Sequence, residues 1–377
     1  MRTGARHKLR EFRAPDEVGA EGRAWTVVRT AYLDREPAPA RRWRPRLAAL
    51  TPALAVIAAV LVLSPAGARV GQIITHALGV RHAAPALSSL PSEGRVLVSG
   101  PGGTWMAAAD GSTRRLGAWS QASWSPHGLY VAVAAGNRLA AVDPRGDIQW
   151  AITRPRVSDP RWYSPSGYRV AYLSGATLRV IAGDGTGDRL LATHVAYVAP
   201  AWRTGAALGP YELAYVTNRH QVVVRDADTA RVLWTASLRT RPLQVMWSGD
   251  GRRLVVVTAH HVRTFAADGA LVATLHVAAS DAALSPDGRS LALVLNRDQV
   301  VVDGRRLFAG AGVRAVSWSP DGRWLLVDWP AADQWVFVRA AGAPRVAAVS
   351  RIAQQFSARG AFPQLEGWCC AARGPAG

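Results

Sequence analysis

Trp318-Ser319-Pro320-Asp321-Gly322, followed by the apolar run Trp324-Leu325-Leu326-Val327, is the stretch that decides the fold. Proline fixes φ near −65° at the first turn position, and glycine supplies the positive φ that closes a tight turn. Ser319 and Asp321 can hydrogen-bond to the local backbone, so four residues specify this turn. An apolar residue before such a turn and an apolar run after it predict a β-hairpin.

The same pattern recurs along the chain. Related stretches begin at Trp124, Tyr163, Trp247 and Leu284, and a degenerate copy begins at Trp202. Successive copies are 39, 39, 45, 37 and 34 residues apart, which fits four short antiparallel strands per unit and hence a propeller blade. We expect the motif positions to fix turns and packing, the tryptophans lying between blades. They are Trp124, Pro126, Gly128, Tyr163, Pro165, Gly167, Trp202, Trp247, Asp250, Gly251, Pro286, Asp287, Gly288, Trp318, Pro320, Asp321 and Gly322.

The two ends of the repeat region complement each other. Residues 95–99, 104–108 and 114–117 form three predicted strands of a unit that lacks its first strand. Residues 362–368 resemble an isolated first strand, with Trp368 in register with the earlier tryptophans. We therefore predict an all-β fold of seven four-stranded blades, in which the C-terminal strand closes the first blade. Six blades is the alternative, if the terminal pieces pack outside the ring.

These motifs carry a family resemblance. Ser-Pro-Asp-Gly after an aromatic or apolar residue and before an apolar strand resembles the WD40-like (PD40) repeats of bacterial TolB-type β-propellers, over residues 95–368. The copies at Leu284 and Trp318 match fully, and the others lack Pro, Asp or both. The resemblance implies an extracytoplasmic propeller used for protein contacts. The chain departs from TolB itself, because it has a predicted membrane anchor where TolB has a separate N-terminal domain.

The predicted anchor is residues 47–68, which carry no charge and lie between Arg46 and Arg69. About 20 apolar residues span a bilayer, and the arginines that precede the segment predict a cytoplasmic N-terminus with the propeller outside. The alternative is a secreted protein cleaved near Ala68, because Ala66-Gly67-Ala68 has small residues at the spacing of a cleavage site. Residues 69–94 are predicted to be a juxtamembrane helix and linker, residues 95–370 the β-propeller, and residues 371–377 a tail.

Residues 1–46 form the predicted cytoplasmic segment. Trp25, Val28 and Tyr32 share one face of a short amphipathic helix, which either docks on a partner or is a nascent helix in a loosely ordered tail. The layout also fits a transmembrane regulator of the anti-sigma type, with these three side chains as the docking face and the propeller as sensor.

The charge does not predict nucleic-acid binding. The net charge is +19, but Lys8 is the only lysine, and the arginines are scattered apart from the cluster at 41–46. We interpret them as compositional bias and a solvated basic surface, with no nucleic-acid partner.

No catalytic motif, cofactor or metal is predicted. Residues 184–188 resemble a calcium loop, but Asp226-Ala227-Asp228 occupies the equivalent turn, which favours a structural role for both. His260-His261 is a poor ligand pair because adjacent side chains of an extended strand point to opposite faces. For Cys369-Cys370 a disulfide between neighbours, intermolecular pairing and two free thiols are all open.

The sequence thus predicts a membrane-anchored, extracytoplasmic propeller of the bacterial cell envelope, a protein-binding scaffold or sensor without catalysis. The anti-sigma type of regulator is one alternative. A propeller hydrolase or lactonase is the other, although it would require clustered carboxylates that the sequence does not display.

Overall fold

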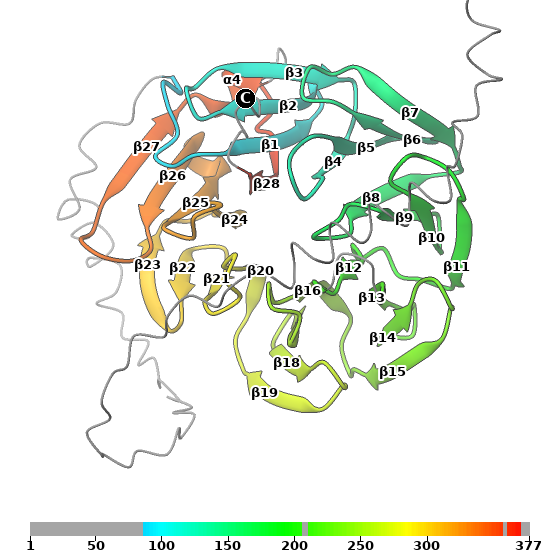
Figure 1. Ribbon diagram of the computed structural model, residues 1–377. Coiled ribbons are helices and arrows are strands. Elements are labelled where there is room, and N and C mark those ends of the chain that lie inside the picture. The colour runs from blue at the N-terminus through cyan, green and yellow to red at the C-terminus, as the bar shows by residue number, and fades with distance from the viewer. Residues whose placement is uncertain (1–85, 206–209, 357–359, 371–377) are drawn as a thin grey trace, which may run out of the picture. The chain divides into compact units, whose positions relative to one another are not determined.

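The computed structural model describes residues 86–205, 210–356 and 360–370, and these form a ring of seven antiparallel four-stranded sheets (Figure 1). We name the four strands of each blade A to D, from the central channel outward. Blade 1 is β28 (Gln364–Cys369), β1 (Arg95–Gly100), β2 (Gly103–Ala108) and β3 (Thr113–Gly117). The fold class, seven blades of four strands, is confirmed.

The other six blades are continuous in sequence. Blade 2 is β4 (Gln121–Trp124), β5 (Val131–Ala135), β6 (Arg138–Val142) and β7 (Ile148–Thr153), and blade 3 is β8 (Val157–Trp162), β9 (Arg169–Ser174), β10 (Thr177–Ala182) and β11 (Arg189–Thr193). Blade 4 is β12 (Ala201–Trp202), β13 (Glu212–Val216), β14 (Gln221–Asp226) and β15 (Val232–Ser237), and blade 5 is β16 (Pro242–Trp247), β17 (Arg253–Thr258), β18 (Val262–Ala266) and β19 (Leu271–Leu275). Blade 6 is β20 (Ala279–Leu284), β21 (Leu291–Leu295), β22 (Gln299–Val302) and β23 (Arg305–Ala309), and blade 7 is β24 (Ala315–Trp318), β25 (Trp324–Trp329), β26 (Gln334–Arg339) and β27 (Val346–Ser350).

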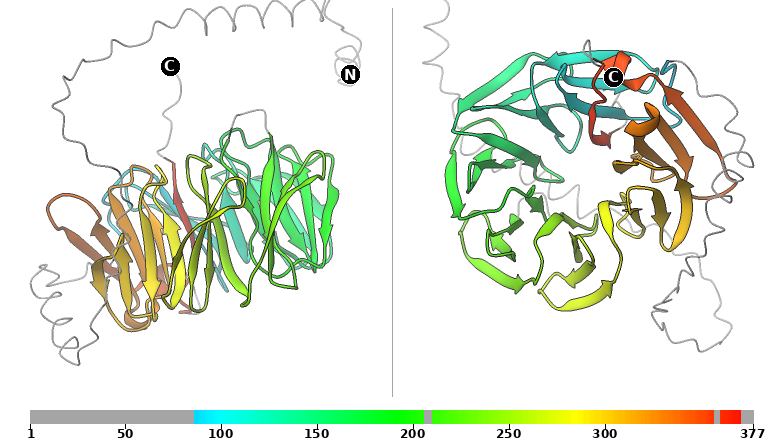
Figure 2. Two further views of the ribbon diagram at one scale, coloured as in Figure 1. Left: turned by 90° about the horizontal axis from the view of Figure 1, so that it is seen from below. Right: turned by 180° about the vertical axis from the view of Figure 1, so that it is seen from behind.

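The strands run between two rims, which the side view of Figure 2 separates. The A–B hairpins and the C–D turns share one end of every blade, and we call this end the A–B rim. The B–C turns and the D–A connections share the other end, the B–C rim. This sorting follows from up-and-down connectivity, since each strand reverses the direction of the one before it.

The repeated motif builds the A–B hairpins. In blade 7 the Ser319 amide donates to the carbonyl of Trp324 at 2.9 Å, and the Gly322 amide donates to the carbonyl of Ser319 at 2.9 Å. The buried Ser319 hydroxyl donates to Asp321 Oδ1 at 2.5 Å and accepts from the Trp324 amide at 2.9 Å. Gly322 has φ +68°, the left-handed conformation that glycine adopts at least cost. The hairpins of blades 5 and 6 repeat these serine–aspartate bonds.

The C-terminal strand closes the ring as the sequence predicted. β28 pairs antiparallel with β1, Trp368 opposite Val96 and Cys369 opposite Arg95. Figure 1 shows β28 as the innermost strand of blade 1, beside blade 7. Trp368 is buried with Phe337 of blade 7, their ring centroids 5.6 Å apart. The two ends of the repeat region are thus held together by a sheet and by an inter-blade core.

Hydrophobic clusters fill the spaces between neighbouring blades. Trp202, Trp247, Trp318 and Trp368 are buried at the ends of their A strands, as expected for inter-blade packing. Residues 86–94, predicted to be a linker, differ from that expectation. Leu87 and Leu90 are buried in the cluster between blades 1 and 7, so this stretch packs on the propeller.

Blade 3 departs from the predicted motif by one residue. Trp162 ends its A strand opposite Val170, and the Tyr163 amide donates to the carbonyl of Arg169 at 2.8 Å. In blades 2, 5, 6 and 7 that backbone bond belongs to the motif serine. Trp162 therefore takes the aromatic position, and the prediction that Tyr163 takes it is wrong. The cause is an extra residue in this turn, which contains Pro165 and Gly167.

Two short helical segments complete the fold. η1 (Pro330–Ala332) lies in the B–C connection of blade 7, and α4 (Ile352–Phe356) lies between β27 and β28. Across the residues that the structure describes, no helix has the length and apolar character needed to span a membrane. The predicted span at 47–68 and the helix predicted within 69–84 lie outside these residues.

Candidate functional site on the A–B rim

The A–B rim carries the repeat motif and a regular set of acidic side chains. Asp250, Asp287 and Asp321 each accept a hydrogen bond from the motif serine and another from a backbone amide two residues on. The serine hydroxyl is the main cause that lowers the pKa of Asp250 and Asp287. These three carboxylates thus form hydrogen bonds within their own turns.

Exposed apolar side chains cluster on this rim in blades 2 and 3. Leu129 and Tyr130 follow the hairpin glycine of blade 2, and Tyr168 follows that of blade 3, with exposed fractions of 57%, 41% and 52%. The two hairpins touch, because a Cβ on Gly167 would lie 3.4 Å from Pro126 Cδ. Leu190, 51% exposed, begins the outer strand of blade 3 at the same rim. We call Leu129, Tyr130, Tyr168 and Leu190 the A–B patch.

The sequence analysis missed the A–B patch. The residues after the turn glycine looked like the start of buried strands, and only the ring shows that they project at the rim. Arginine fills this place in blades 5, 6 and 7, as Arg252, Arg289 and Arg323. That contrast within the repeat is the signal that could have marked blades 2 and 3.

A hollow of about 760 Å³ opens between blades 6 and 7 on the same rim. Asp287 and Asp321 line it from the two hairpins, and Asp303 and Arg305 line it from the C–D turn of blade 6. Asp303 accepts from the Leu291 amide at 3.0 Å, and Arg305 donates to the carbonyl of Ala340 at 2.7 Å. Since its polar groups are bonded within the fold, the hollow indicates no ligand class.

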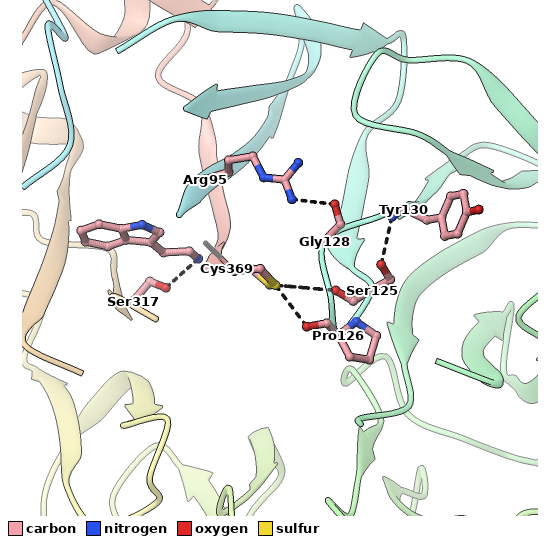
Figure 3. The surroundings of a disulfide bond; sticks show 9 residues. Arg95, Ser125, Pro126, Gly128, Tyr130, Ser317 and Cys369 are labelled. Atoms are coloured by element: carbon pink, nitrogen blue, oxygen red, sulfur yellow. Dashed lines mark hydrogen bonds between the residues drawn. A yellow bond between two sulfur atoms is a disulfide. The ribbon is translucent and has the colours of Figure 1, made fainter. Parts of the chain in front are cut away.

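Cys369 and Cys370 form a disulfide where β28 reaches the A–B rim (Figure 3). Cys370 Sγ lies 3.2 Å from the carbonyl oxygen of Pro126 in the neighbouring blade. Arg95 donates to the carbonyl of Gly128 at 2.6 Å, and its guanidinium lies 4.8 Å from the centre of the Trp124 ring. Of the three states left open by the sequence, the structure has the intramolecular disulfide. It lies against the hairpin that carries Leu129 and Tyr130.

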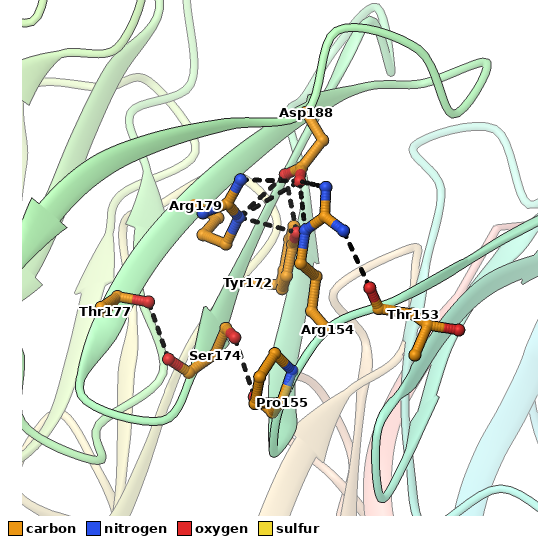
Figure 4. A network of polar contacts seen from close by, with 8 residues as sticks. All are labelled: Thr153, Arg154, Pro155, Tyr172, Ser174, Thr177, Arg179 and Asp188. Atoms are coloured by element: carbon orange, nitrogen blue, oxygen red, sulfur yellow. Dashed lines mark hydrogen bonds and ion pairs between the residues drawn. The ribbon is translucent and has the colours of Figure 1, made fainter.

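The calcium-like turn of blade 3 is an ion-pair site (Figure 4). The Asp188 side chain is 7% exposed, and its Oδ2 lies 2.8 Å from Arg179 Nη2 and 2.7 Å from Arg154 Nη2. The Tyr172 hydroxyl donates to Asp188 Oδ1 at 2.6 Å. Burial opposes ionisation, but the hydrogen bonds from Arg179, Tyr172 and Arg154 prevail and lower the pKa of Asp188. The other carboxylate, Asp184, accepts from Thr186.

A second aspartate is bound in the same way. In the equivalent turn of blade 4, Asp228 pairs with Arg169 at 3.1 Å and Arg189 at 2.6 Å. Among residues 86–205, 210–356 and 360–370, no group of three or more His, Cys, Asp or Glu side chains could hold a metal ion.

Two acidic side chains on the innermost strands have raised pKa values. Burial raises the pKa of Glu366 on β28 to about 7, although Arg161, Ser99 and the Ala122 amide act in the opposite direction. The residue as a whole is half-buried, but its Oε1 is buried and has no hydrogen-bond partner among the described residues. Burial also raises the pKa of Asp281 on β20 to about 7, while its Oδ2 accepts from the Val316 amide of the next blade at 2.9 Å. Both acids lie where neighbouring A strands meet, so their charge affects blade contacts.

The remaining predicted residues lie elsewhere. His260 and His261 lie at the B–C turn of blade 5, where the His261 ring centroid is 4.9 Å from that of His276. Trp25, Val28 and Tyr32, the predicted docking face, lie outside the described residues, so the docking role stays a prediction.

Comparisons with known proteins support the fold. The β-propeller domain of Cps50 (Swd1) from Myceliophteria thermophila has a TM-score of 0.51 and 16% identity, over 63% of this chain and 94% of that one. Hsv2 from Kluyvelomyces marxianus has a TM-score of 0.48 and 15% identity, over 66% and 90%. A KlHsv2 with loop 6CD replaced by a Gly-Ser linker has a TM-score of 0.51 and 15% identity, over 67% and 92%.

The two similarities with a TM-score of 0.51 support a WD40-like β-propeller fold, and at such identities they concern the fold alone. No family model matches this chain. No curated protein matches it either.

Proposed function

We propose that this propeller is a protein-binding scaffold whose contact surface is the A–B patch. The observation that carries the proposal is the set of large apolar side chains Leu129, Tyr130, Tyr168 and Leu190, all more than two-fifths exposed on adjoining blades. Apolar groups gathered on one sector favour a partner, because exposed clusters of this kind mark interaction sites on soluble domains. Tyrosine is also enriched where proteins bind each other.

The environment of the patch suits binding. Hydrogen bonds within the turns hold the hairpins of blades 2 and 3 in place. The Gly128 amide donates to the carbonyl of Ser125 and the Gly167 amide to the carbonyl of Tyr163, each at 2.9 Å, and the Tyr130 amide donates to Ser125 Oγ at 3.0 Å. A rigid scaffold reduces the entropy lost on association. The bonded motif carboxylates and the engaged Asp188 and Asp228 offer no catalytic group, which favours binding over hydrolysis.

We propose further that residues 47–68 anchor the chain as a single span, with a cytoplasmic N-terminus and an extracytoplasmic propeller. The uncharged apolar length and the preceding arginines support this orientation. A sensor role in the cell envelope, and membership of the TolB-like PD40 propellers, are part of the same proposal. A topology reporter fused after Gly377 tests it, and a cytoplasmic signal there would refute the orientation.

Site-specific photo-crosslinking tests the scaffold role. A benzophenone amino acid at Tyr130 or Tyr168 should give one dominant protein adduct in intact cells. The same probe at Val232, which begins the outer strand of blade 4 and so lies outside blades 2 and 3, should not. Leu129→Asp should remove the adduct formed from position 168. Leu271→Asp is the matched control, since Leu271 is 56% exposed, close to the 57% of Leu129, but lies on β19. Equal loss in both variants, or no adduct from either tyrosine position, would refute the proposal.

A further inference from the structure

The two rims of the propeller differ in charge. On the A–B rim, exposed arginines stand beside aspartates of the motif and of the C–D turns. Arg289 lies 3.9 Å from the motif Asp287, and Arg145 lies 3.1 Å from Asp143 in the C–D turn of blade 2. The Asp-Gly turns therefore balance the arginines of that rim. The B–C rim has no such motif, and its turns carry a different set of side chains.

Basic residues dominate the B–C rim. Its turns and connections expose Arg138, Arg156, Arg219, Arg239, Arg241 and Arg297. None of these six forms an ion pair within the described part of the chain. The acidic side chains in the same turns and connections are Asp298 and Asp333, which are only half-exposed. Asp333 is also engaged, because its Oδ1 accepts from the Ala353 amide at 2.8 Å.

The charge is concentrated in one sector. Arg219, Arg239, Arg241 and Arg297 come from blades 4 to 6, and the neighbouring turns also carry His194, His220, His260, His261 and His276. Backbone bonds join these turns across blades, as the Asn218 amide donates to the carbonyl of His194 at 2.9 Å. The fully exposed charged side chains of these turns are all basic, and such a set attracts anions over a Debye length of about 8 Å at physiological salt.

Apolar side chains lie within this basic sector. Tyr197, Leu243 and Leu275 are 55%, 48% and 42% exposed in the D–A connections or at the strand ends next to them. Arg241 precedes Leu243 by two residues, and His276 follows Leu275 directly. Surfaces that bind at a lipid–water boundary typically expose basic groups together with aromatic and aliphatic side chains, as this rim does.

We propose that the B–C rim of blades 4 to 6 docks on an anionic lipid surface. The arginines would lie among the headgroup phosphates, while Leu243 and Leu275 would reach the acyl boundary. A nucleic acid or an acidic protein would satisfy the arginines but would leave the two leucines without a role. The inference rests on the proposed membrane anchor for bringing the rim to a bilayer, and it is independent of the A–B patch, which would face away from the membrane.

Hydrogen exchange of the full chain in lipid nanodiscs tests the proposal. Amides of residues 217–221, 238–243 and 258–262 should exchange at least tenfold more slowly in discs with phosphatidylglycerol than in phosphatidylcholine discs. The difference should disappear in 0.5 M salt, because charge screening acts on the docking and not on a hydrophobic span. The A–B hairpins should exchange equally in both discs.

Charge reversal supplies the matched variants. Arg239→Glu with Arg241→Glu should abolish the lipid-dependent protection, while Arg252→Glu with Arg289→Glu on the A–B rim should leave it unchanged. Tyr197→Ser with Leu275→Ser should weaken the protection while keeping its salt dependence. Exchange in the B strands reports whether each variant is folded.

Three results would overturn the docking proposal. They are equal exchange in the two discs, equal effects of the two charge reversals, and full protection by oligo-dA or polyglutamate in phosphatidylcholine discs. Carbonate extraction tests the anchor separately. A chain released by carbonate but still protected by anionic discs would refute the anchor and keep the docking rim.

Discussion

The Trp318 indole N–H donates to the carbonyl of Ala283 in the preceding blade, at 3.0 Å. Trp202 makes the same bond to Arg161, at 2.9 Å. Both acceptors come directly before the residue that ends the neighbouring A strand, Leu284 or Trp162. At these two blade junctions the repeat therefore sets the strand-to-strand register through a side chain as well as through packing. The bond of Trp202 independently identifies Trp162 as the aromatic position of blade 3.

Ser319→Ala should destabilise the protein by about 1–3 kcal/mol, the usual cost of leaving buried partners unsatisfied. The substitution removes the acceptor of the Trp324 amide and the donor to Asp321. Chemical denaturation measures the change. Ser290→Ala is the control, because the hydroxyl of Ser290 forms no hydrogen bond with the described residues, and its effect should stay within about 0.5 kcal/mol. Similar losses in the two variants would contradict the role given to the motif serine.

Stability should fall as the pH rises from about 4.5 to about 7, and Glu366 should contribute to this fall. An unfolded glutamic acid titrates near 4.5, and burial raises the native pKa to about 7, so the native state binds the extra proton. The contribution of Glu366 to stability is fully present below pH 4.5 and is lost as the pH rises through about 7. Its size is on the order of 3 kcal/mol.

Glu366→Gln isolates this contribution. Melting temperatures at pH 5 and pH 8 should differ by about 5 °C less in the variant than in the wild type. Glu93→Gln, at an exposed position, should keep the wild-type difference. If Glu366→Gln kept the wild-type difference in melting temperature between pH 5 and pH 8, the pKa shift assigned to Glu366 would be refuted.

Asp188→Asn should cost about 2–4 kcal/mol, since it leaves Arg179 and Arg154 without their common counter-charge. Urea unfolding of the variant measures the loss. Calcium provides a second readout, because the ion-pair role predicts equal melting temperatures of the wild type in calcium and in EDTA. Stabilisation by calcium that the variant lacks would restore the metal-site interpretation.

Removing residues 363–370 should disrupt blade 1 and the closed ring, whereas Cys369→Ser with Cys370→Ser should cost less than about 1 kcal/mol. A cross-link between adjacent residues closes almost no loop and so removes little entropy from the unfolded chain. The strand itself supplies the sheet bonds to β1 and the burial of Trp368. Circular dichroism and denaturation of both variants would distinguish them, and a large loss in the serine variant would assign the closure to the disulfide.

The sequence by itself determined the architecture. Turn chemistry is local, so Pro320, Asp321 and Gly322 predict a hairpin from the sequence alone. The full and degenerate copies of this turn, together with the unpaired strand at Trp368, predict the number of blades. Trp368 predicted the closing strand, because an isolated A strand must find a sheet. The register in blade 3 could not be predicted, since Trp162 and Tyr163 are both aromatic and only the cross-strand partner distinguishes them.

Only the tertiary structure decided which residues lie together on a surface. The ring brings the hairpin of Pro126 against that of Gly167 and places Asp188 between Arg154 and Arg179. It also separates arginines that lie beside aspartates on one rim from arginines without an ion pair among the described residues on the other. The burial that shifts Glu366 likewise depends on two neighbouring blades. Exposure and charge balance arise from packing between distant segments, and for that reason the sequence determined the fold of this protein while the ring decided its surfaces.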